Sequence, residues 1–160
     1  MAADSSPSES NISSFVERLR SHEMPQADVR GHFELVREWV GNLGYATGPP
    51  EMPPIRVYVG LRRRDWLFLL PKLSQFMKRM GWDMDEAQKT EHGEVRAWEQ
   101  IPAVIFSGPD GFMILGRKGF GPRYIQHEMS HIFETYLGLR PGTLEKKNLD
   151  LWAHEHDKTK

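Results

Sequence analysis

Residues 122–137, with the sequence PRYIQHEMSHIFETYL, decide how this chain is interpreted. At about 100° per residue, several apolar side chains share one broad face of a helix, namely Ile125, Met129, Ile132, Phe133, Tyr136 and Leu137. His127, His131 and Glu134 fall on the opposite face. Pro122 suits a first helical turn, and Gly138 followed by Leu139 is typical of a helix end. The stretch therefore predicts an amphipathic helix with its apolar face toward the core.

The front of this helix carries the HExxH motif His127-Glu128-Met129-Ser130-His131. Residues four apart lie on one helical face, so His127 and His131 can direct two imidazole nitrogens at one Zn²⁺. Glu128 is then placed to act as general base toward a metal-activated water. The alternative interpretation is a surface helix with two solvated histidines. The pattern favours a zinc site.

Composition narrows the class of protein. The chain has 160 residues, no cysteine, 39% hydrophobic residues and a formal net charge of −1. These values indicate a globular protein without disulfides, and they argue against nucleic-acid or membrane binding driven by bulk charge. The run Arg62-Arg63-Arg64 is expected in a solvated turn. No stretch resembles a signal peptide or a membrane span, and we expect a cytoplasmic protein.

Three regions are expected along the chain. Residues 1–10 are small, polar and rich in Ser, as in a disordered tail. Residues 11–48 carry the pattern of two helices, a short one with Phe15 and a longer one from about Pro25 to Leu43. After a proline-rich linker, residues 55–160 are expected to form the domain that holds the zinc site.

This last region mixes strand and helix patterns. Residues 55–59 alternate and predict a strand, which Asp65 follows as the expected cap of another helix. Residues 101–106 and 112–115 flank a turn rich in Gly and Pro and predict a hairpin, whose second strand is expected to be an open edge above the cleft. The glycine-rich residues 116–121 are expected to form a rim of the site. The order of elements predicts an α+β domain, with a small, mostly antiparallel sheet behind the zinc helix.

A third zinc ligand is expected downstream, because catalytic zinc usually has three protein ligands and a water. A short turn at residues 140–142 and a helix beginning at Thr143 would run back antiparallel to the zinc helix. At roughly 1.5 Å rise per residue, this helix would bring Asp150 and Glu155 level with the histidines. Glu145 lies nearer the turn and is less well placed to reach the metal. Helical angles place Glu155 on the packed side and Asp150 with solvent-facing residues, which favours Glu155.

The motif HEMSH followed by the segment Asp150-Leu151-Trp152-Ala153-His154-Glu155 resembles the gluzincin metallopeptidases, including the aminopeptidase and peptidase-MA-like groups. That family has HExxH and a later Trp-x-x-Glu, whose Glu is the third zinc ligand. The resemblance covers roughly residues 100–157 and implies a zincin-like fold with a C-terminal glutamate helix. It implies that His127, His131 and Glu155 bind Zn²⁺. Glu128 would be the general base.

Three hypotheses follow for function. The first is a zinc-dependent metallopeptidase that hydrolyses peptide bonds in a peptide or protein substrate, without a nucleic-acid or membrane partner. The second is a catalytically weak, zinc-binding regulatory or interaction module that retains the zincin fold. The third is a structural helical protein with an accidental HExxH. Substrate, cleavage mode and oligomeric state are not specified by the sequence.

Several residues near the motif could assist catalysis, and each of them also has an ordinary structural interpretation. Tyr124, His154 and His156 are candidate donors to an oxyanion, or else ordinary packed and solvent-facing residues. Glu134 lies one turn after His131 and is either its orienting partner or a surface carboxylate. The remaining histidines have no ligand spacing and are expected to be structural or exposed, namely His22, His32 and His92.

Overall fold

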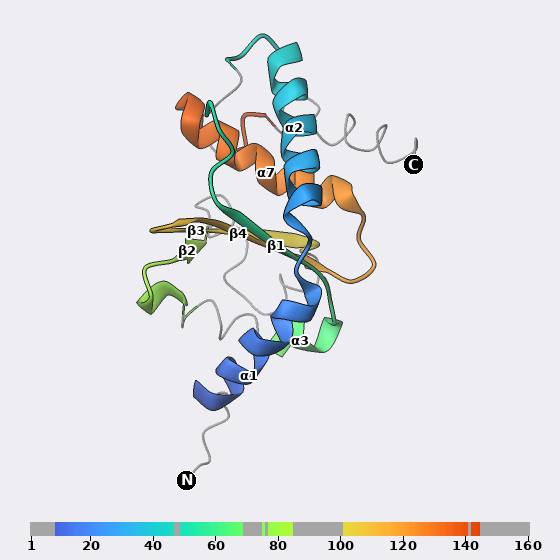
Figure 1. Cartoon of the computed structure of the whole chain (residues 1–160). Helices are drawn as coiled ribbons and strands as arrows, with labels where there is room; N and C mark the ends of the chain where they lie inside the picture. The colour runs from blue at the N-terminus through green and yellow to red at the C-terminus, as the bar shows by residue number, and fades with distance from the viewer. Residues whose placement is uncertain are drawn as a thin grey trace.

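A sheet lies at the centre of the molecule, with helices above and below it (Figure 1). The computed structural model describes residues 9–46, 49–68, 75, 77–84, 101–140 and 142–144. Within these residues the sheet has four strands in the order β1-β4-β3-β2. Their bounds are Ile55–Leu61 for β1, Asp83–Met84 for β2, Ala103–Gly108 for β3 and Gly111–Arg117 for β4. The β3–β4 and β2–β3 pairs are antiparallel and the β1–β4 pair is parallel, so the expected mixed fold with a mostly antiparallel sheet is confirmed.

The expectation that the second hairpin strand is an open edge is wrong. β4 pairs with β3 on one side and with β1 on the other, where Ile55 lies opposite Phe112. The Phe112 amide donates to the Pro54 carbonyl at 2.9 Å, and a Cβ at Gly111 would collide with the same carbonyl. Alternation within the hairpin says nothing of this partner, because β1 lies about fifty residues earlier in the chain.

Helices cover both faces of the sheet (Figure 1). One layer holds α2 and α7, and the other holds α1, the short 3-10 helix η1 and α3. Their bounds are Glu9–Leu19 for α1, Arg20–His22 for η1, Gln26–Asn42 for α2, Arg63–Phe68 for α3 and Pro122–Leu137 for α7. Strand alternation supplies both cores, since Val57 packs with α2 and α7, whereas Tyr58 packs with α1 and α3.

The predicted helices differ from the observed ones mainly at their ends. α1 begins at Glu9, two residues before the expected start, and residues 1–8 lie outside the described part of the chain. α2 begins after Pro25, as expected, and buries Val29, Phe33, Val36 and Val40. Asp65 lies in the first turn of α3 rather than at its cap.

The most important helix, α7, has the predicted bounds. Gly121 precedes it in an extended conformation and Pro122 opens its first turn. Gly138 ends it in the left-handed conformation at φ 70°, and the Leu139 amide donates to the Glu134 carbonyl at 2.9 Å. No helix among the described residues has the length and apolar character needed to cross a membrane.

Candidate metal centre

The HExxH side chains converge on one point. His127, Glu128 and His131 each offer a ligand atom, and these atoms all lie within 4.8 Å of one another. The two imidazole rings stand edge to face, with centroids 5.3 Å apart and an interplanar angle of 83°. Glu128 and His131 are each only 5% exposed, and His127 is half-buried. The predicted convergence of the HExxH side chains is therefore confirmed, and the three together form a group that could hold a metal ion.

Glu134 holds one of these histidines in place. Its Oε1 lies 2.7 Å from His131 Nδ1, and both groups are buried. The Gly142 amide donates to Oε1 at 3.1 Å and the Leu144 amide donates to Oε2 at 2.8 Å. An ionised carboxylate can only accept, so Nδ1 donates its proton to Glu134, and Nε2 of the neutral imidazole would then be the nitrogen that binds a metal. Glu134 is thus the orienting partner, not a surface carboxylate.

The electrostatics of Glu134 agree with this role. Burial alone would raise the pKa of the carboxyl group. The hydrogen bonds from His131, Leu144 and Gly142, together with the charge interaction with His131, outweigh burial and lower the pKa of Glu134. The ionised carboxylate therefore ties the metal helix to the turn that begins the C-terminal segment.

Gln126 belongs to the same helix and was not singled out from the sequence. Its side chain is 2% exposed, and its Nε2 lies 3.0 Å from His32 Nδ1 on α2. Its Oε1 has no hydrogen-bond partner among the described residues. The sequence did contain a signal for its burial, because Gln126 lies at the edge of an otherwise apolar face of the helix. The contact with Gln126 gives His32 a structural role. His22 has a structural role as well, because its Nδ1 lies 3.0 Å from the Val59 carbonyl.

Tyr124 lies one turn before the motif, but its hydroxyl is already engaged. Arg123 Nη2 donates to the Tyr124 hydroxyl at 2.6 Å, and the Tyr124 ring meets Phe120 edge to face with centroids 5.3 Å apart. Its role as oxyanion donor stays a prediction. The third ligand is not placed, because its candidates Glu145, Asp150 and Glu155 lie outside the described residues. The same holds for the donor candidates His154 and His156, and for His92, which was expected to be structural or exposed.

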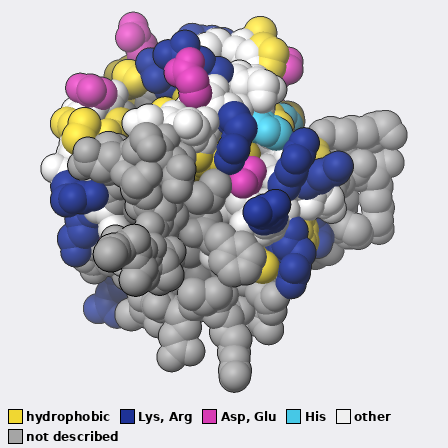
Figure 2. Space-filling model, turned by 90° about the horizontal axis from the view of Figure 1, so that it is seen from below, with side chains coloured by type: hydrophobic (Ala, Val, Ile, Leu, Met, Phe, Trp, Pro, Cys, Tyr) yellow, Lys and Arg dark blue, Asp and Glu magenta, His cyan; other side chains and the backbone are white. Residues whose placement is uncertain are grey.

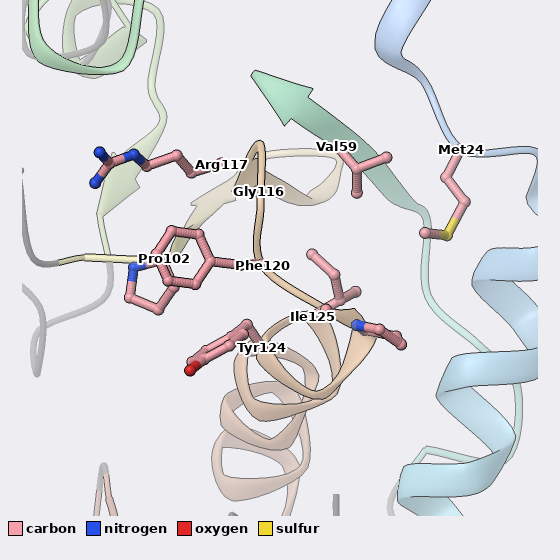
Figure 3. Close-up of a pocket in the computed structure, with 10 residues that line it drawn as sticks. Met24, Val59, Pro102, Gly116, Arg117, Phe120, Tyr124 and Ile125 are labelled. Atoms are coloured by element: carbon pink, nitrogen blue, oxygen red, sulfur yellow. The ribbon is translucent and has the colours of Figure 1, made fainter. Parts of the chain in front are cut away.

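An apolar pocket adjoins the first turn of α7. It has a volume of about 190 Å³ and lies between the end of β1, the glycine-rich residues 116–121 and the helix (Figure 3). Val59 and Met24 line one side, and Phe120 and Tyr124 line the other. Ile125, two residues before the first histidine, lies between them.

No protein-family model, no curated protein and no solved structure matches this chain. The class that the fold and the site define is therefore a mixed α and β protein with a candidate metal centre on one buried helix.

Proposed function

We propose that this protein is a zinc-dependent metallopeptidase with a gluzincin-like site. His127 and His131 are the proposed zinc ligands and Glu128 is the proposed general base. The observation that carries the proposal is the convergence of the three HExxH side chains within 4.8 Å. Two imidazoles and carboxylates are the donor set that Zn²⁺ commonly has in hydrolases.

Burial of the site supports a resident cation. Polar groups are costly to bury unless they are hydrogen-bonded or bound to metal. His131 Nδ1 and Glu134 satisfy one another, and Glu128 and His131 are each only 5% exposed. A cation held by the HExxH side chains would help to offset the cost of burying them, and the Glu134 hydrogen bond would fix the His131 ring before the metal arrives.

The residues of the motif divide the chemistry between them. Bound zinc would supply a Lewis acid that polarises the peptide carbonyl and lowers the pKa of a water molecule. Glu128 would take the proton of the attacking water and pass it to the leaving amine. Glu134 would keep the ligand nitrogen of His131 in one orientation, so that the geometry is present before substrate binds.

Glu155 remains the proposed third ligand. Its support is the Trp152-x-x-Glu155 resemblance and its expected level opposite His127 on a following helix. The Glu155→Ala variant should bind zinc much more weakly than wild type, whereas Asp150→Asn and Glu145→Gln should bind it normally. Normal zinc affinity in Glu155→Ala would assign the third ligand elsewhere.

The function itself is tested by turnover. The purified protein, loaded with zinc, is incubated with a mixed peptide library, and new termini are detected by mass spectrometry. Wild type should produce cleavage products that Glu128→Gln does not. A zinc-loaded wild type without any cleavage would support the regulatory or interaction module instead of the peptidase.

A further inference from the structure

Cationic side chains gather where the parallel strands β1 and β4 end. Leu61 pairs with Arg117 across the two strands, and the Lys118 amide donates to the Leu61 carbonyl at 2.8 Å. The run Arg62-Arg63-Arg64 therefore begins beside Arg117 and Lys118. Figure 2 shows a group of Lys and Arg side chains at the right of the face seen from below, with others at its left and upper edges.

A chain of ring contacts extends this group of cations to the metal helix. The Arg117 guanidinium lies 5.7 Å from the Phe120 ring centroid, and the Phe120 and Tyr124 centroids are 5.3 Å apart. The Arg123 guanidinium lies 4.7 Å from the Tyr124 ring centroid. We call these two arginines, together with the cations at the ends of β1 and β4, the basic rim; its members are Arg62, Arg63, Arg64, Arg117, Lys118 and Arg123.

Among the residues that the structure describes, the basic rim is a local excess of positive charge, in a chain whose formal net charge is −1. Asp65 follows Arg64 directly in sequence, but its carboxylate forms an ion pair with Arg18 of α1 at 3.3 Å. The first turn of α7 contains Arg123 and no acidic residue, although helix N-termini favour acidic side chains. Both observations leave this end of the molecule suited to an anionic partner.

The apolar pocket opens beside the basic rim and shares Arg117 with it (Figure 3). Its volume of about 190 Å³ is smaller than that of pockets for drug-sized ligands and suits one apolar side chain. Phe120 borders it and is 42% exposed, so part of an aromatic ring faces solvent beside the pocket. The combination therefore favours an anionic polymer that also carries an apolar side chain.

A peptide meets this requirement better than a nucleic acid. The Phe120 and Tyr124 rings already contact one another and two guanidinium groups, so they are poor platforms for stacking bases. Tyr124 precedes His127 by three residues, about 4.5 Å along the helix axis at 1.5 Å per residue. An extended peptide advances about 3.3 Å per residue, so a peptide that passes Tyr124 needs only one or two residues to reach the level of His127 along the helix axis.

We propose that the basic rim and the apolar pocket bind an acidic peptide segment, with one apolar side chain in the pocket, and that this segment is the substrate of the metal centre. That the segment is a substrate rests on the proposed peptidase function, whereas its binding does not. Asp and Glu residues of the segment would pair with Arg62 and Lys118, and a residue such as Leu would occupy the pocket beside Ile125.

Binding is measured with the full chain carrying Glu128→Gln, so that no probe is cleaved. The probes are fluorescent peptides with a central Leu flanked by Asp and Glu, the same peptide with Gly for Leu, the same with Lys for the acids, and single-stranded RNA of equal length. The acidic Leu peptide should bind at least about tenfold more tightly than the other three and more weakly as salt is added. Equal binding of all probes, or tighter binding of RNA, would overturn the proposal.

Charge reversal identifies the surface. Arg62→Glu with Lys118→Glu should weaken binding of the acidic Leu peptide at least about tenfold, because two exposed cations become anions. The matched control, Arg30→Glu with Lys78→Glu, reverses two exposed cations elsewhere and should leave binding unchanged. Phe120→Ala should remove the preference for Leu over Gly. Equal losses in the rim and control variants would contradict the assignment.

The two proposals fail separately. If wild type cleaves peptides with no preference for acidic sequences and the rim variant cleaves them equally well, the peptidase stands and this inference falls. If the acidic Leu peptide binds as described but zinc-loaded wild type never cleaves it, the binding site stands and the peptidase falls.

Discussion

Two neighbouring helices on the same face of the sheet, α2 and α7, bury very different side chains (Figure 1). α2 buries only apolar residues, namely Val29, Phe33, Val36, Trp39 and Val40. α7 buries four apolar residues and five polar ones, the latter being Gln126, Glu128, Ser130, His131 and Glu134. Every buried polar side chain among the described residues belongs to α7.

The difference separates what folding needs from what a site needs. α2 shows that this layer can be held by apolar contacts, and the stacked rings of Phe33 and Phe133, 4.8 Å apart, join it to α7. Burying the Glu128 carboxylate and the His131 imidazole beside them costs desolvation energy, whereas the buried Glu134 carboxylate accepts hydrogen bonds from the Gly142 and Leu144 amides. The proposed metal centre would give a reason to bury Glu128 and His131, and the predictions below test this division between the two helices.

The largest effect is expected at Glu128. Glu128→Gln keeps the size of the side chain but removes the general base, so hydrolysis should fall by about two to four orders of magnitude while zinc is retained. The comparison is made by kcat/KM on a peptide found in the library and by metal content. Glu38→Gln, on the exposed face of α2, is the control and should cleave normally. Hydrolysis at the wild-type rate by Glu128→Gln would exclude the proposed water activation.

Truncation on α2 should affect stability and not metal. Phe33→Ala removes a fully buried ring and should lower the free energy of unfolding by about 3–5 kcal/mol. Urea denaturation measures this loss. The fraction that remains folded should still bind zinc with wild-type stoichiometry, because no candidate ligand has changed. Loss of zinc from the folded fraction would mean that the two helices are not separable in this way.

An intermediate effect is expected at Glu134. Glu134→Gln keeps a hydrogen-bonding group but loses the charge that holds His131 Nδ1–H, and zinc affinity should fall about 10–100-fold. Competition with a chelator of known affinity measures the change, with Glu38→Gln again as control. Unchanged affinity would show that the His131 orientation does not depend on this carboxylate.

The smallest effect is a dependence of stability on pH in the metal-free protein. The folded state lowers the pKa of Glu134, so its ionised form contributes stability that is present above the unfolded pKa and is lost as pH falls through the lower, folded pKa. Below pH 4.5, the ordinary pKa of a glutamate carboxyl group, the free energy of unfolding should therefore fall more in wild type than in Glu134→Gln. Parallel stability curves for the two proteins in acid would refute this contribution.

Local signals were enough to predict the helix that carries the site. Pro122, the left-handed Gly138 and the apolar residue after it act within a few residues of the helix ends, so the bounds of α7 can be predicted without knowledge of the rest of the fold. The spacing of His127 and His131 is also local, and it predicted their convergence. The β3–β4 hairpin was predicted for the same reason, from a short turn between alternating residues.

Features that depend on distant segments could not be predicted. The pairing of β1 with β4 places Ile55 opposite Phe112, and the residue pattern of neither strand indicates which strand is its partner. The burial of Glu134 depends on the amides of Gly142 and Leu144, which fold back onto α7 after its end. Glu155 stays a prediction from helical level and resemblance.

The central claim is that α7 buries polar groups in order to hold zinc. Its most direct test is the zinc content of the purified protein, measured by elemental analysis for wild type and for His131→Ala, with His32→Ala on α2 as control. About one zinc per chain is expected in wild type and in His32→Ala, and almost none in His131→Ala. Equal zinc in all three proteins, or no zinc in folded wild type supplied with the metal, would contradict the assignment of the HExxH helix as a metal centre.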